Sequence, residues 1–513
     1  MAVSERAPDD ATPLDRLLDP HDAASTALVF QERAWTYADL ASFAGALSGA
    51  MADLAGERVA FMLPNGPEAV TTYLACFRSG AVATPLNMRY AAPEVERALR
   101  RVRPRWLVVH ESRLDRLDHV DAAVLDGVRV LTVSGGDHSP RDRREPLAPL
   151  LAAPVRPASP SLDPEQPALL FLTSGSTGTP KGVVHSRRSV SAMLTSTGEA
   201  MGDVGTDDVM QVCDPLVHVS GFIETLTTLL RGGTVLLYDG FDVETYAAGL
   251  LAYRPTLLCT HIDVLAQLTR DPGAHREWMR SLRGVYTGGD TVPATLQREF
   301  IDVMGKPIAV GYGMTEAIWL TVNREPRLDR DGCIGRPVGG TEIRTDADTG
   351  ELLVRGPMVM SHYWEDDPLT REALCDGWFH TGDLGRRDEN GVWWFEGRIK
   401  DLIVRRTSKI TPGEVESAVN QHPDVLGSAV VAAADADEGQ VPVAFVVLRE
   451  GSQLTADGLT AFLRSSIAEY KLPSRVHFLD ALPLTPSGKI AHRELHEPLR
   501  ETLHETLHET GAT

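Results

Sequence analysis

A loop between two apolar runs constrains this chain more than any other stretch of its sequence. The apolar residues 168–172 lead into TSGSTGTPKG (residues 173–182), and a second apolar run follows. This pattern predicts a buried strand, a flexible loop and another buried segment. In such a loop, glycines let backbone N–H groups approach an anion closely, hydroxyls donate further hydrogen bonds, and Lys181 supplies a positive charge. The loop therefore predicts a phosphate site.

This loop has two other possible interpretations. A Walker A loop needs the pattern G-x-x-x-x-G-K-[ST]. Counting five residues on from Gly175 reaches Pro180, and Gly182 rather than Ser or Thr follows Lys181, so the loop is not of that type. A polar Ser/Gly linker remains an alternative. Its position between two apolar runs and its Pro-Lys-Gly ending favour the phosphate site.

Composition sets the scale of the fold and excludes some partners. With 513 residues, 43% of them hydrophobic, the chain can bury a large core and should divide into at least two domains. Its 50 basic and 71 acidic residues give a net charge of −21, which argues against nucleic acid or an anionic membrane as a principal partner. The five cysteines contain no C-x-x-C pair, so we expect reduced thiols without a disulfide framework or a zinc site.

The ends and the hydropathy of the chain predict a cytoplasmic protein. The N-terminal stretch is acidic and contains prolines, which is not typical of a signal peptide. No apolar run approaches the roughly 20 residues that a membrane-spanning helix needs. We therefore expect a soluble protein without stable membrane insertion.

The order of apolar patterns predicts an α/β fold. Helical and strand patterns alternate over residues 35–109 and again from 168 to 323, which is typical of parallel sheets covered by helices. Residues 135–166 are rich in proline and charge and should form a surface connector. Residues 332–396 contain short strand-like runs separated by Gly and Asp turns, which favour a small antiparallel sheet or barrel. A further compact unit with strand and helix patterns follows.

Five more stretches follow the loop in a characteristic order. They are PLVHVSGF (215–222), YTGGDTV (286–292), GYGMTEA (311–317), HTGDL (380–384) with GRIKD (397–401), and LPLTPSGKIAHREL (482–495). Together with the loop they resemble the adenylate-forming superfamily, which includes acyl-CoA synthetases, peptide-synthetase adenylation domains and luciferase. The resemblance covers residues 36–495 and is closest to acyl-CoA synthetases.

The resemblance implies a reaction and a two-part architecture. The reaction is activation of a carboxylic acid by ATP and Mg²⁺ to acyl-AMP with release of pyrophosphate, followed by transfer to a thiol such as CoA. An α/β fold is implied, with a large N-terminal region (1–398) of stacked α/β subdomains and a small β-barrel. A small mobile α+β C-terminal domain (399–513) would rotate about a hinge at Lys400.

The resemblance also implies which residues bind ATP and the metal ion. The phosphate loop contributes Thr173, Ser174, Gly175, Ser176, Thr177, Gly178 and Lys181. The adenine turn contributes Gly288, Gly289 and Asp290, and the next motif contributes Tyr312 near adenine, Gly313, Met314 and Thr315 near the α-phosphate. Glu316 would bind Mg²⁺, with Thr177 as a second metal-site residue, because hard oxygen ligands suit this ion. Asp383 and Arg398 would bind the ribose. Taken singly, the glycine turn, the Thr-Glu pair and the Asp–Arg pair could each be an ordinary turn or ion pair.

Lys489 resembles the lysine that assists adenylation. A lone lysine is usually a solvated surface charge, but this one follows Ser-Gly in the last motif. The chemistry needs a cation, because a substrate carboxylate attacks the α-phosphate and negative charge builds up while pyrophosphate leaves. We therefore assign Lys489, Thr315, Glu316 and His218 to the catalytic set.

The acid-binding residues are implied less directly. The resemblance assigns His218, Gly221, Gly311 and Ile318 to the acyl pocket, with His218 either a gate or a structural histidine. The segment DPLVHVSG (214–221) lacks the Phe-Asp pairing by which peptide-synthetase domains anchor an α-ammonium group. The candidate lining is mostly apolar or small, which favours an apolar monocarboxylic acid.

One segment departs from the family pattern. After the hinge the family usually has one or two glycines, which let the pantetheine arm pass, whereas this chain has Arg406 and Thr407. Added bulk, and the loss of easy access to positive φ, could impair transfer to CoA. Alternatively, Arg406 faces solvent or meets the CoA phosphates. The other functions considered are loading of a carrier-protein pantetheine or transfer to another protein, a non-catalytic acyl-adenylate-binding protein, and a luciferase-type oxygenation.

Overall fold

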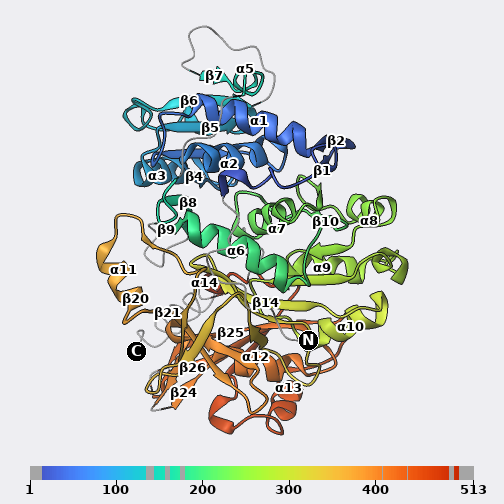
Figure 1. Cartoon of the computed structure of the whole chain (residues 1–513). Coiled ribbons are helices and arrows are strands. Elements are labelled where there is room, and N and C mark those ends of the chain that lie inside the picture. The colour runs from blue at the N-terminus through green and yellow to red at the C-terminus, as the bar shows by residue number, and fades with distance from the viewer. Residues whose placement is uncertain are drawn as a thin grey trace.

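A computed structural model describes residues 14–133, 144–155, 162–173, 180–406, 408–435, 437–484 and 490–495. Its strands fall into three sheets within this part of the chain. Figure 1 shows the first sheet at one end of the molecule, the third at the other, and helices α6 to α10 between them. The mixed α/β class predicted from the alternating patterns is confirmed.

The first sheet contains eight described strands and is parallel over most of its width. In spatial order they are β19 (His362–Tyr363), β9 (Lys181–Ser186), β8 (Pro167–Thr173), β4 (Val82–Pro85), β3 (Arg58–Met62), β5 (Trp106–His110), β6 (Arg129–Val133) and β7 (Arg144–Pro146). The predicted strand before the phosphate loop is β8, and it pairs antiparallel with β9 after the loop. The residues that flank the loop, Thr173 at the end of β8 and Lys181 at the start of β9, are therefore neighbours across this strand pair.

The second sheet contains fourteen described strands and changes character along its width. Its order is β17 (Glu342–Thr345), β18 (Glu351–Arg355), β21 (Trp378–Arg387), β22 (Trp393–Arg398), β16 (Cys333–Pro337), β15 (Ala317–Asn323), β14 (Ala309–Met314), β13 (Gly284–Gly288), β12 (Leu257–Cys259), β10 (Val209–Val212), β11 (Thr234–Leu237), β1 (Thr26–Phe30) and β2 (Arg33–Thr36), with β20 (Leu374–Cys375) beside β21. The run from β14 to β1 is parallel. The predicted antiparallel strands of residues 332–396 continue this sheet through the pairing of β16 with β15.

Helices cover both large sheets. They are α1 (Tyr37–Ala50), α2 (Pro67–Ser79), α3 (Ala92–Val102), α4 (Leu114–Leu117), α5 (Ala148–Leu151), α6 (Arg187–Ala200), α7 (Val219–Leu230), α8 (Val243–Ala252), α9 (Ile262–Arg270), α10 (Ala294–Met304) and α11 (Asp367–Ala373). The short elements β7 and α5 lie within the stretch predicted to be a connector.

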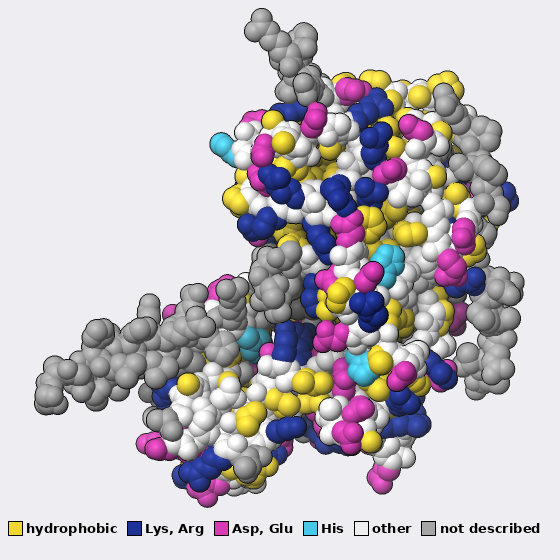
Figure 2. Space-filling model, turned by 90° about the vertical axis from the view of Figure 1, so that its left-hand side faces the viewer, with side chains coloured by type: hydrophobic (Ala, Val, Ile, Leu, Met, Phe, Trp, Pro, Cys, Tyr) yellow, Lys and Arg dark blue, Asp and Glu magenta, His cyan; other side chains and the backbone are white. Residues whose placement is uncertain are grey.

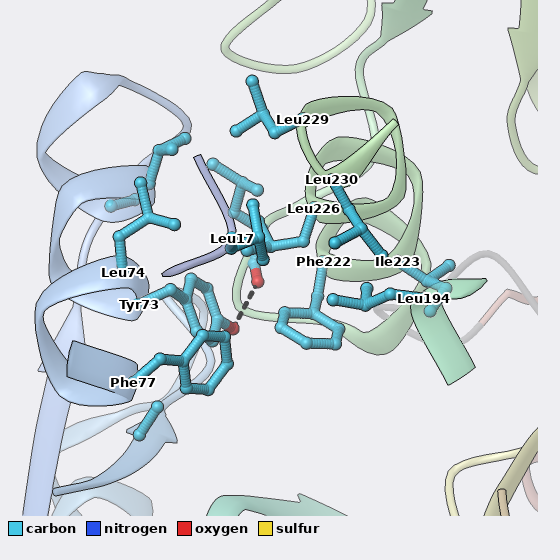
Figure 3. Packing of buried hydrophobic residues seen from close by; sticks show 14 of the residues in the cluster. Leu17, Tyr73, Leu74, Phe77, Leu194, Phe222, Ile223, Leu226, Leu229 and Leu230 are labelled. Carbon is cyan, nitrogen blue, oxygen red and sulfur yellow. Dashed lines mark hydrogen bonds between the residues drawn. The ribbon is translucent and has the colours of Figure 1, made fainter. Parts of the chain in front are cut away.

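The two large sheets share one hydrophobic core through helices α2 and α7. Figure 3 shows Tyr73 and Phe77 of α2 packing against Phe222 of α7, and the rings of Tyr73 and Phe222 are 5.0 Å apart. The hydroxyl of Tyr73 donates to the carbonyl of Leu216 over 2.7 Å. This bond fixes the backbone just before α7, the helix that lines the acid cavity described below.

The third sheet follows the short 3₁₀ turn Ile399–Asp401. It consists of β24 (Ser408–Ile410), β23 (Ile403–Arg405), β26 (Gly439–Leu448), β25 (Val425–Asp435) and β27 (Arg475–Leu479), with helices α12 (Pro412–Asn420), α13 (Ala456–Leu463) and α14 (His492–Leu495). Ile403, Val415 and Leu459 are buried in a core cluster composed only of residues from this part of the chain. The C-terminal unit therefore has its own core.

The surface is charged but not uniformly acidic. Figure 2 shows basic side chains spread among acidic ones over one face of the molecule, despite the net charge of −21. None of the described helices is both long and apolar enough to cross a bilayer.

Candidate active site

A cleft of about 700 Å³ collects most of the predicted nucleotide-binding residues. It lies where β8 and β9 of the first sheet face β14, β21 and β22 of the second. A volume of this size is ordinary for a cofactor or nucleotide site. The predicted residues that line it are Thr173, Lys181, Gly289, Asp290, Tyr312, Gly313, Met314, Thr315, Glu316, Asp383, Arg398 and Lys400.

Some predicted residues lie outside the described part of the chain. They are Ser174, Gly175, Ser176, Thr177 and Gly178 of the phosphate loop, Thr407 of the hairpin, and Lys489. The flanks of the loop are described: Thr173 ends β8 and Lys181 begins β9, and the two residues pair directly. Both flanking residues line the cleft.

The glycines of the adenine turn and of the neighbouring strand are required by close contacts. A Cβ on Gly288 would lie 2.9 Å from the carbonyl oxygen of Gly311, and one on Gly313 would lie 2.4 Å from the backbone nitrogen of Trp319. Gly289 has φ of +89°, which is costly for residues with a side chain. Because these glycines carry no side chain, backbone atoms of β13 and β14 form a flat surface that a planar group can contact.

Glu316 is held by a residue that lies outside all the recognised motifs. The hydroxyl of Tyr363 in β19 donates to Glu316 Oε1 over 2.8 Å, and Lys181 Nζ lies 5.4 Å from the centre of the Tyr363 ring. Burial and the negative charge of Glu316 raise the pKa of Tyr363, so the hydroxyl remains a donor. Tyr363 thus orients the Glu316 carboxylate on the side of the cleft where Lys181 lies. Nothing in the sequence around it indicates this contact.

Thr315 is supported from behind by a buried histidine. His185 in β9 has no exposed surface, and its Nε2–H donates to the Thr315 carbonyl over 2.7 Å. Burial lowers the pKa of His185 to about 4, so the imidazole is neutral at physiological pH. This bond joins β9 to the end of β14 and fixes the backbone at the Thr-Glu pair.

Asp383 contacts Tyr312 and Arg398, which were predicted to lie near the adenine and the ribose. The Tyr312 hydroxyl donates to Asp383 Oδ2 over 2.8 Å, and Arg398 Nε lies 3.4 Å from Asp383 Oδ1. Asp383 is 7% exposed, whereas the Arg398 side chain is 46% exposed at the cleft. Tyr312 was predicted to stack near adenine, and its hydroxyl holds the carboxylate predicted to bind the ribose.

The part of β21 that carries Asp383 is held by Glu351, which sequence reasoning missed. Glu351 Oε1 accepts from the Gly382 N–H over 2.8 Å, and Glu351 Oε2 lies 3.0 Å from His380 Nδ1. Glu351 begins β18, whereas the motif lies on β21, so only the pairing of these strands brings them together.

A second, smaller cavity of about 90 Å³ adjoins the cleft. It contains His218, Gly311 and Ile318 of the predicted acyl pocket, together with residues of α7 and of the β12–α9 connection. Gly311, Met314 and Thr315 line both cavities. Gly221 is absent from the described lining, and a Cβ there would lie 2.4 Å from the carbonyl oxygen of Asp214. Gly221 thus permits α7 to pack against the preceding loop.

A polar chain of side chains runs along one wall of the small cavity. His218 Nδ1 lies 3.0 Å from Ser220 Oγ, and His261 Nε2 lies 3.4 Å from the same oxygen. His261 Nε2 is also 3.3 Å from Asp214 Oδ2, while the Thr260 hydroxyl donates to Asp214 Oδ1 over 3.0 Å. Burial raises the pKa of Asp214, and the neighbouring His261 opposes that rise. The expected mostly apolar lining is therefore interrupted by buried ionisable groups.

A third cavity, of about 640 Å³, lies between the C-terminal unit and the rest of the chain. Leu484 and Ile490, which flank the segment carrying Lys489, line it together with Asp290 and Asp331. Asp290 and Asp331 also line the large cleft. Burial, with repulsion from nearby carboxylates, raises the pKa of Glu416 in α12 to about 8 at this junction.

The hairpin that departs from the family pattern adopts a glycine-like backbone at its tip. Arg406 has φ of +55°, and its N–H donates to the Glu438 carbonyl over 2.7 Å. Its side chain is 69% exposed, with Nε 3.8 Å from Glu438 Oε2. Arg406 adopts the positive φ that the sequence argument expected it to resist, and its hydrogen bond to Glu438, the residue before β26, holds this conformation.

Comparisons with known proteins agree with this geometry. Residues 20–364 match the family described as AMP-binding enzyme, and residues 414–489 match the AMP-binding enzyme C-terminal domain. An indoleacetate–CoA ligase from Aromatoleum aromaticum is 34% identical over 93% of this chain and 96% of its own length. A feruloyl-CoA synthase from Amycolatopsis sp. is 33% identical with the same coverage. The crystal structure of ATP-bound MatB from Rhodopseudomonas palustris matches with a TM-score of 0.86 and 28% identity, covering 95% of this chain and 98% of that one.

Proposed function

The chain belongs to the AMP-binding enzyme family and is an AMP-forming acid–thiol ligase of the acyl-CoA synthetase type, and we propose that it activates a compact aromatic monocarboxylic acid. The names of two relatives, an indoleacetate–CoA ligase and a feruloyl-CoA synthase, support an aromatic acid. The small cavity argues against a long acyl chain, since its volume is about 90 Å³.

The junction of the two cavities at Met314 and Thr315 carries this proposal. A nucleotide in the large cleft and an acid in the small cavity would meet at this junction. Holding both reactants in a near-attack geometry supplies much of the rate enhancement in such a reaction. In our assignment Thr315 contacts the α-phosphate, and Gly288, Gly289 and Gly311 form the wall along which adenine and the acid lie.

The first step needs no covalent bond to the protein. One oxygen of the substrate carboxylate attacks the α-phosphorus of ATP, the bond from that phosphorus to the bridging oxygen breaks, and pyrophosphate leaves. Lys181 neutralises phosphate charge from the side of β9, and Lys489 stabilises the charge that develops on the α-phosphate oxygens. Asp383 and Arg398 hold the ribose hydroxyls.

Glu316 fits a role in binding Mg²⁺ on the triphosphate. Magnesium sites on nucleotides commonly use one or two carboxylates together with phosphate oxygens and water. Glu316 lines the cleft, and Tyr363 donates to only one of its oxygens, Oε1. When bound, the ion would neutralise triphosphate charge and orient the leaving pyrophosphate. Thr177 is assigned to the same ion from the sequence.

In the second step the thiol sulfur of CoA attacks the acyl carbonyl carbon, and AMP leaves with the bonding electron pair. We propose that the unit 399–513 rotates on the unit 1–398 between the two steps, with Lys400 in the hinge. The 3₁₀ turn at this position, the separate C-terminal core and the position of Lys400 at the cleft support this assignment. The exposed side chain of Arg406 favours a thioester step that is not blocked.

The proposal is tested by following AMP and pyrophosphate formation from ATP and Mg²⁺ with a panel of aromatic, aliphatic and terpenoid acids. We expect compact aromatic acids to give acyl-CoA when CoA is present, and acyl-AMP when it is omitted. A better rate with a long-chain fatty acid would overturn the substrate assignment. Transfer of the acyl group to a phosphopantetheinylated carrier protein but not to CoA would show that the carrier protein, and not CoA, is the thiol acceptor. No AMP with any acid would remove the catalytic assignment.

A further inference from the structure

Glu224 is a buried acid that the proposed reaction does not use. It lies on α7, is 1% exposed and lines the small acid cavity. Its Oε2 atom has no hydrogen-bond partner within the described residues. Leaving a buried polar atom unpaired is costly, and such atoms in native proteins usually have a partner. A bound substrate group could be that partner.

Burial and neighbouring groups favour the uncharged form of the Glu224 carboxyl group. Burial, the negative charge of Asp214 and a hydrogen bond to Asp214 raise the pKa of Glu224 well above its ordinary value, and a hydrogen bond with Cys259 opposes the rise. These contacts occupy part of the carboxyl group and leave Oε2 without a partner among the described residues. Asp214 already has Thr260 and His261 as partners, so it does not need the substrate. A protonated carboxyl group offers one donor and a free acceptor oxygen. Glu224 can therefore accept a hydrogen bond without adding a bare charge to the cavity.

The position of Glu224 separates it from the reacting atoms. Residues at the junction with the large cleft, such as Met314 and Thr315, line both cavities, whereas Glu224 lines only the small one. It follows Ser220 by one helical turn, so the two side chains share a face of α7. An acid whose carboxylate lies at the junction would place another part of the molecule beside Glu224.

Part of the remaining lining offers an apolar contact surface to the occupant. Val219, Ile223, Ile318 and Trp319 contribute hydrophobic surface. The cavity of about 90 Å³ is smaller than the roughly 150 Å³ apolar cavities that accept benzene, so an aromatic ring fits only as a compact group with small adjustments. The other polar side chains of the lining contact one another, so Oε2 of Glu224 is the polar atom of this cavity that lacks a partner among the described residues. Such an atom can select a substrate by a hydrogen bond.

We propose that the acid substrate carries a hydroxyl or amino group that donates a hydrogen bond to Glu224. This inference rests on the proposed function and narrows its substrate class from aromatic acids in general to compact ones with a donor distant from the carboxylate. The neutral carboxyl group would discriminate against the analogue without that donor, because binding the analogue leaves Oε2 unpaired and buried.

The test compares matched acids on matched variants. The acids are phenylacetate, its 3- and 4-hydroxy and amino derivatives, and the corresponding methyl derivatives, assayed by pyrophosphate release. The variants are Glu224→Gln, which keeps an acceptor oxygen, and Glu224→Met, which removes it. Thr225→Val is the control, because Thr225 is on the same helix, fully buried and also has an unpaired side-chain oxygen, but does not line the cavity.

We expect the unmodified protein to prefer at least one donor-bearing acid over its methyl analogue by about tenfold or more in kcat/KM. Glu224→Met should reduce this preference to less than about threefold, while Glu224→Gln and Thr225→Val retain it. Thermal unfolding checks that each variant is folded. If Glu224→Met does not fold, Glu224→Leu takes its place as the variant without an acceptor, and equal activity of the unmodified protein with donor-bearing and methyl acids still overturns the inference.

Two negative results are distinguishable. Equal activity with donor-bearing and methyl acids overturns this inference and leaves the proposed function intact. Retention of the preference in folded Glu224→Met also overturns it, because another group must then recognise the donor. No activity with any acid, including those of the wider panel, removes the proposed function itself and the inference with it.

Discussion

The two cavities of the N-terminal region differ in how their walls are encoded. The large cleft is lined by residues of short motifs on strands or directly next to them, including Lys181, Thr315 and Asp383. The small cavity draws Glu224 from the second turn of α7 and His261 from the start of α9, neither in a motif that indicates chemistry by itself. We therefore expect residues of the large cleft to affect the reaction with ATP and residues of the small cavity to affect the choice of acid.

The cavities also differ in their charges. Lys181, Arg398 and Lys400 stand at the large cleft and can meet a polyanion in a chain of net charge −21. The small cavity contains the buried carboxyl group of Glu224, whose pKa is raised well above its ordinary value by burial and by the nearby charge of Asp214. Variants in each cavity should consequently change different kinetic constants.

The largest expected effect is on the nucleotide side. Replacing Asp383 by Ala removes the proposed ribose acceptor and leaves the buried Tyr312 hydroxyl without its partner. We expect KM for ATP to rise by roughly 30- to 1,000-fold, as for truncation of a buried, hydrogen-bonded charge. The KM of the acid should change much less. Steady-state kinetics with each substrate varied in turn measures this split.

Asp376→Asn is the matched control for that variant, because Asp376 is an exposed turn residue outside both cavities. It should leave both Michaelis constants unchanged. An equal rise of both constants in Asp383→Ala would contradict the separation of the two cavities.

The second prediction concerns His185, which supports the backbone of Thr315 in the wall common to both cavities. We expect the protonation of His185 to lower the stability of the fold at low pH. Its pKa is lowered to about 4 in the folded protein from 6.5, so folding favours the neutral form. This contribution is complete above about pH 6.5 and is lost as the pH falls towards 4, amounting at most to about 3 kcal/mol. Urea unfolding between pH 7.5 and 4 should show a smaller loss of stability in His185→Gln than in the unmodified protein.

His119→Gln serves as the control for this experiment, since His119 is exposed. Its unfolding free energy should follow that of the unmodified protein across the pH range. A His185→Gln variant with the full acid sensitivity would show that other groups cause it.

A smaller effect is expected for Trp319, an apolar residue of the small cavity. Trp319 lies over Gly311, with a Cβ on that glycine only 2.9 Å from the indole ring, and it lines the small cavity. Trp319→Leu should enlarge this cavity and raise kcat/KM by about tenfold for acids one or two methylene groups longer. The KM for ATP should stay within about threefold of its value in the unmodified protein, because the substitution changes contacts with the acid and not with the nucleotide.

Trp278→Leu is the matched control, because Trp278 is equally buried but lies in a separate core cluster. It should lower stability without changing the order of preferred acids. The idea fails if Trp319→Leu leaves that order unchanged while the protein is folded.

The smallest effect is expected in the C-terminal hairpin. Arg406 is exposed at a backbone position with positive φ. Arg406→Gly should stabilise the hairpin by no more than about 1 kcal/mol and change the transfer of acyl groups from acyl-AMP to CoA by less than about threefold. Single-turnover transfer from preformed acyl-AMP measures this step. Arg406→Lys, which keeps the charge and the backbone constraint, is the control. A tenfold faster transfer to CoA in Arg406→Gly but not in Arg406→Lys would support the hypothesis that Arg406 blocks the channel for the pantetheine arm.

Much of the fold could be predicted from local patterns. The strand–loop–strand unit at β8 and β9 and the parallel strands near β13 and β14 follow directly from apolar runs bounded by glycines. The pairing of β16 with β15, which joins the antiparallel strands to the parallel sheet, could not be predicted, because pairing between distant strands depends on register and packing rather than on local sequence.

The candidate site divides in the same way. By itself, the sequence determined the family and the reaction, and it predicted the residues that would bind ATP, because phosphate, ribose and adenine impose fixed residue types at short spacings. Only the tertiary structure brought Tyr363 to Glu316, Glu351 to Gly382 and Glu224 into the acid cavity. These contacts join separate elements, and the burial that gives them their chemistry is a property of the packed chain.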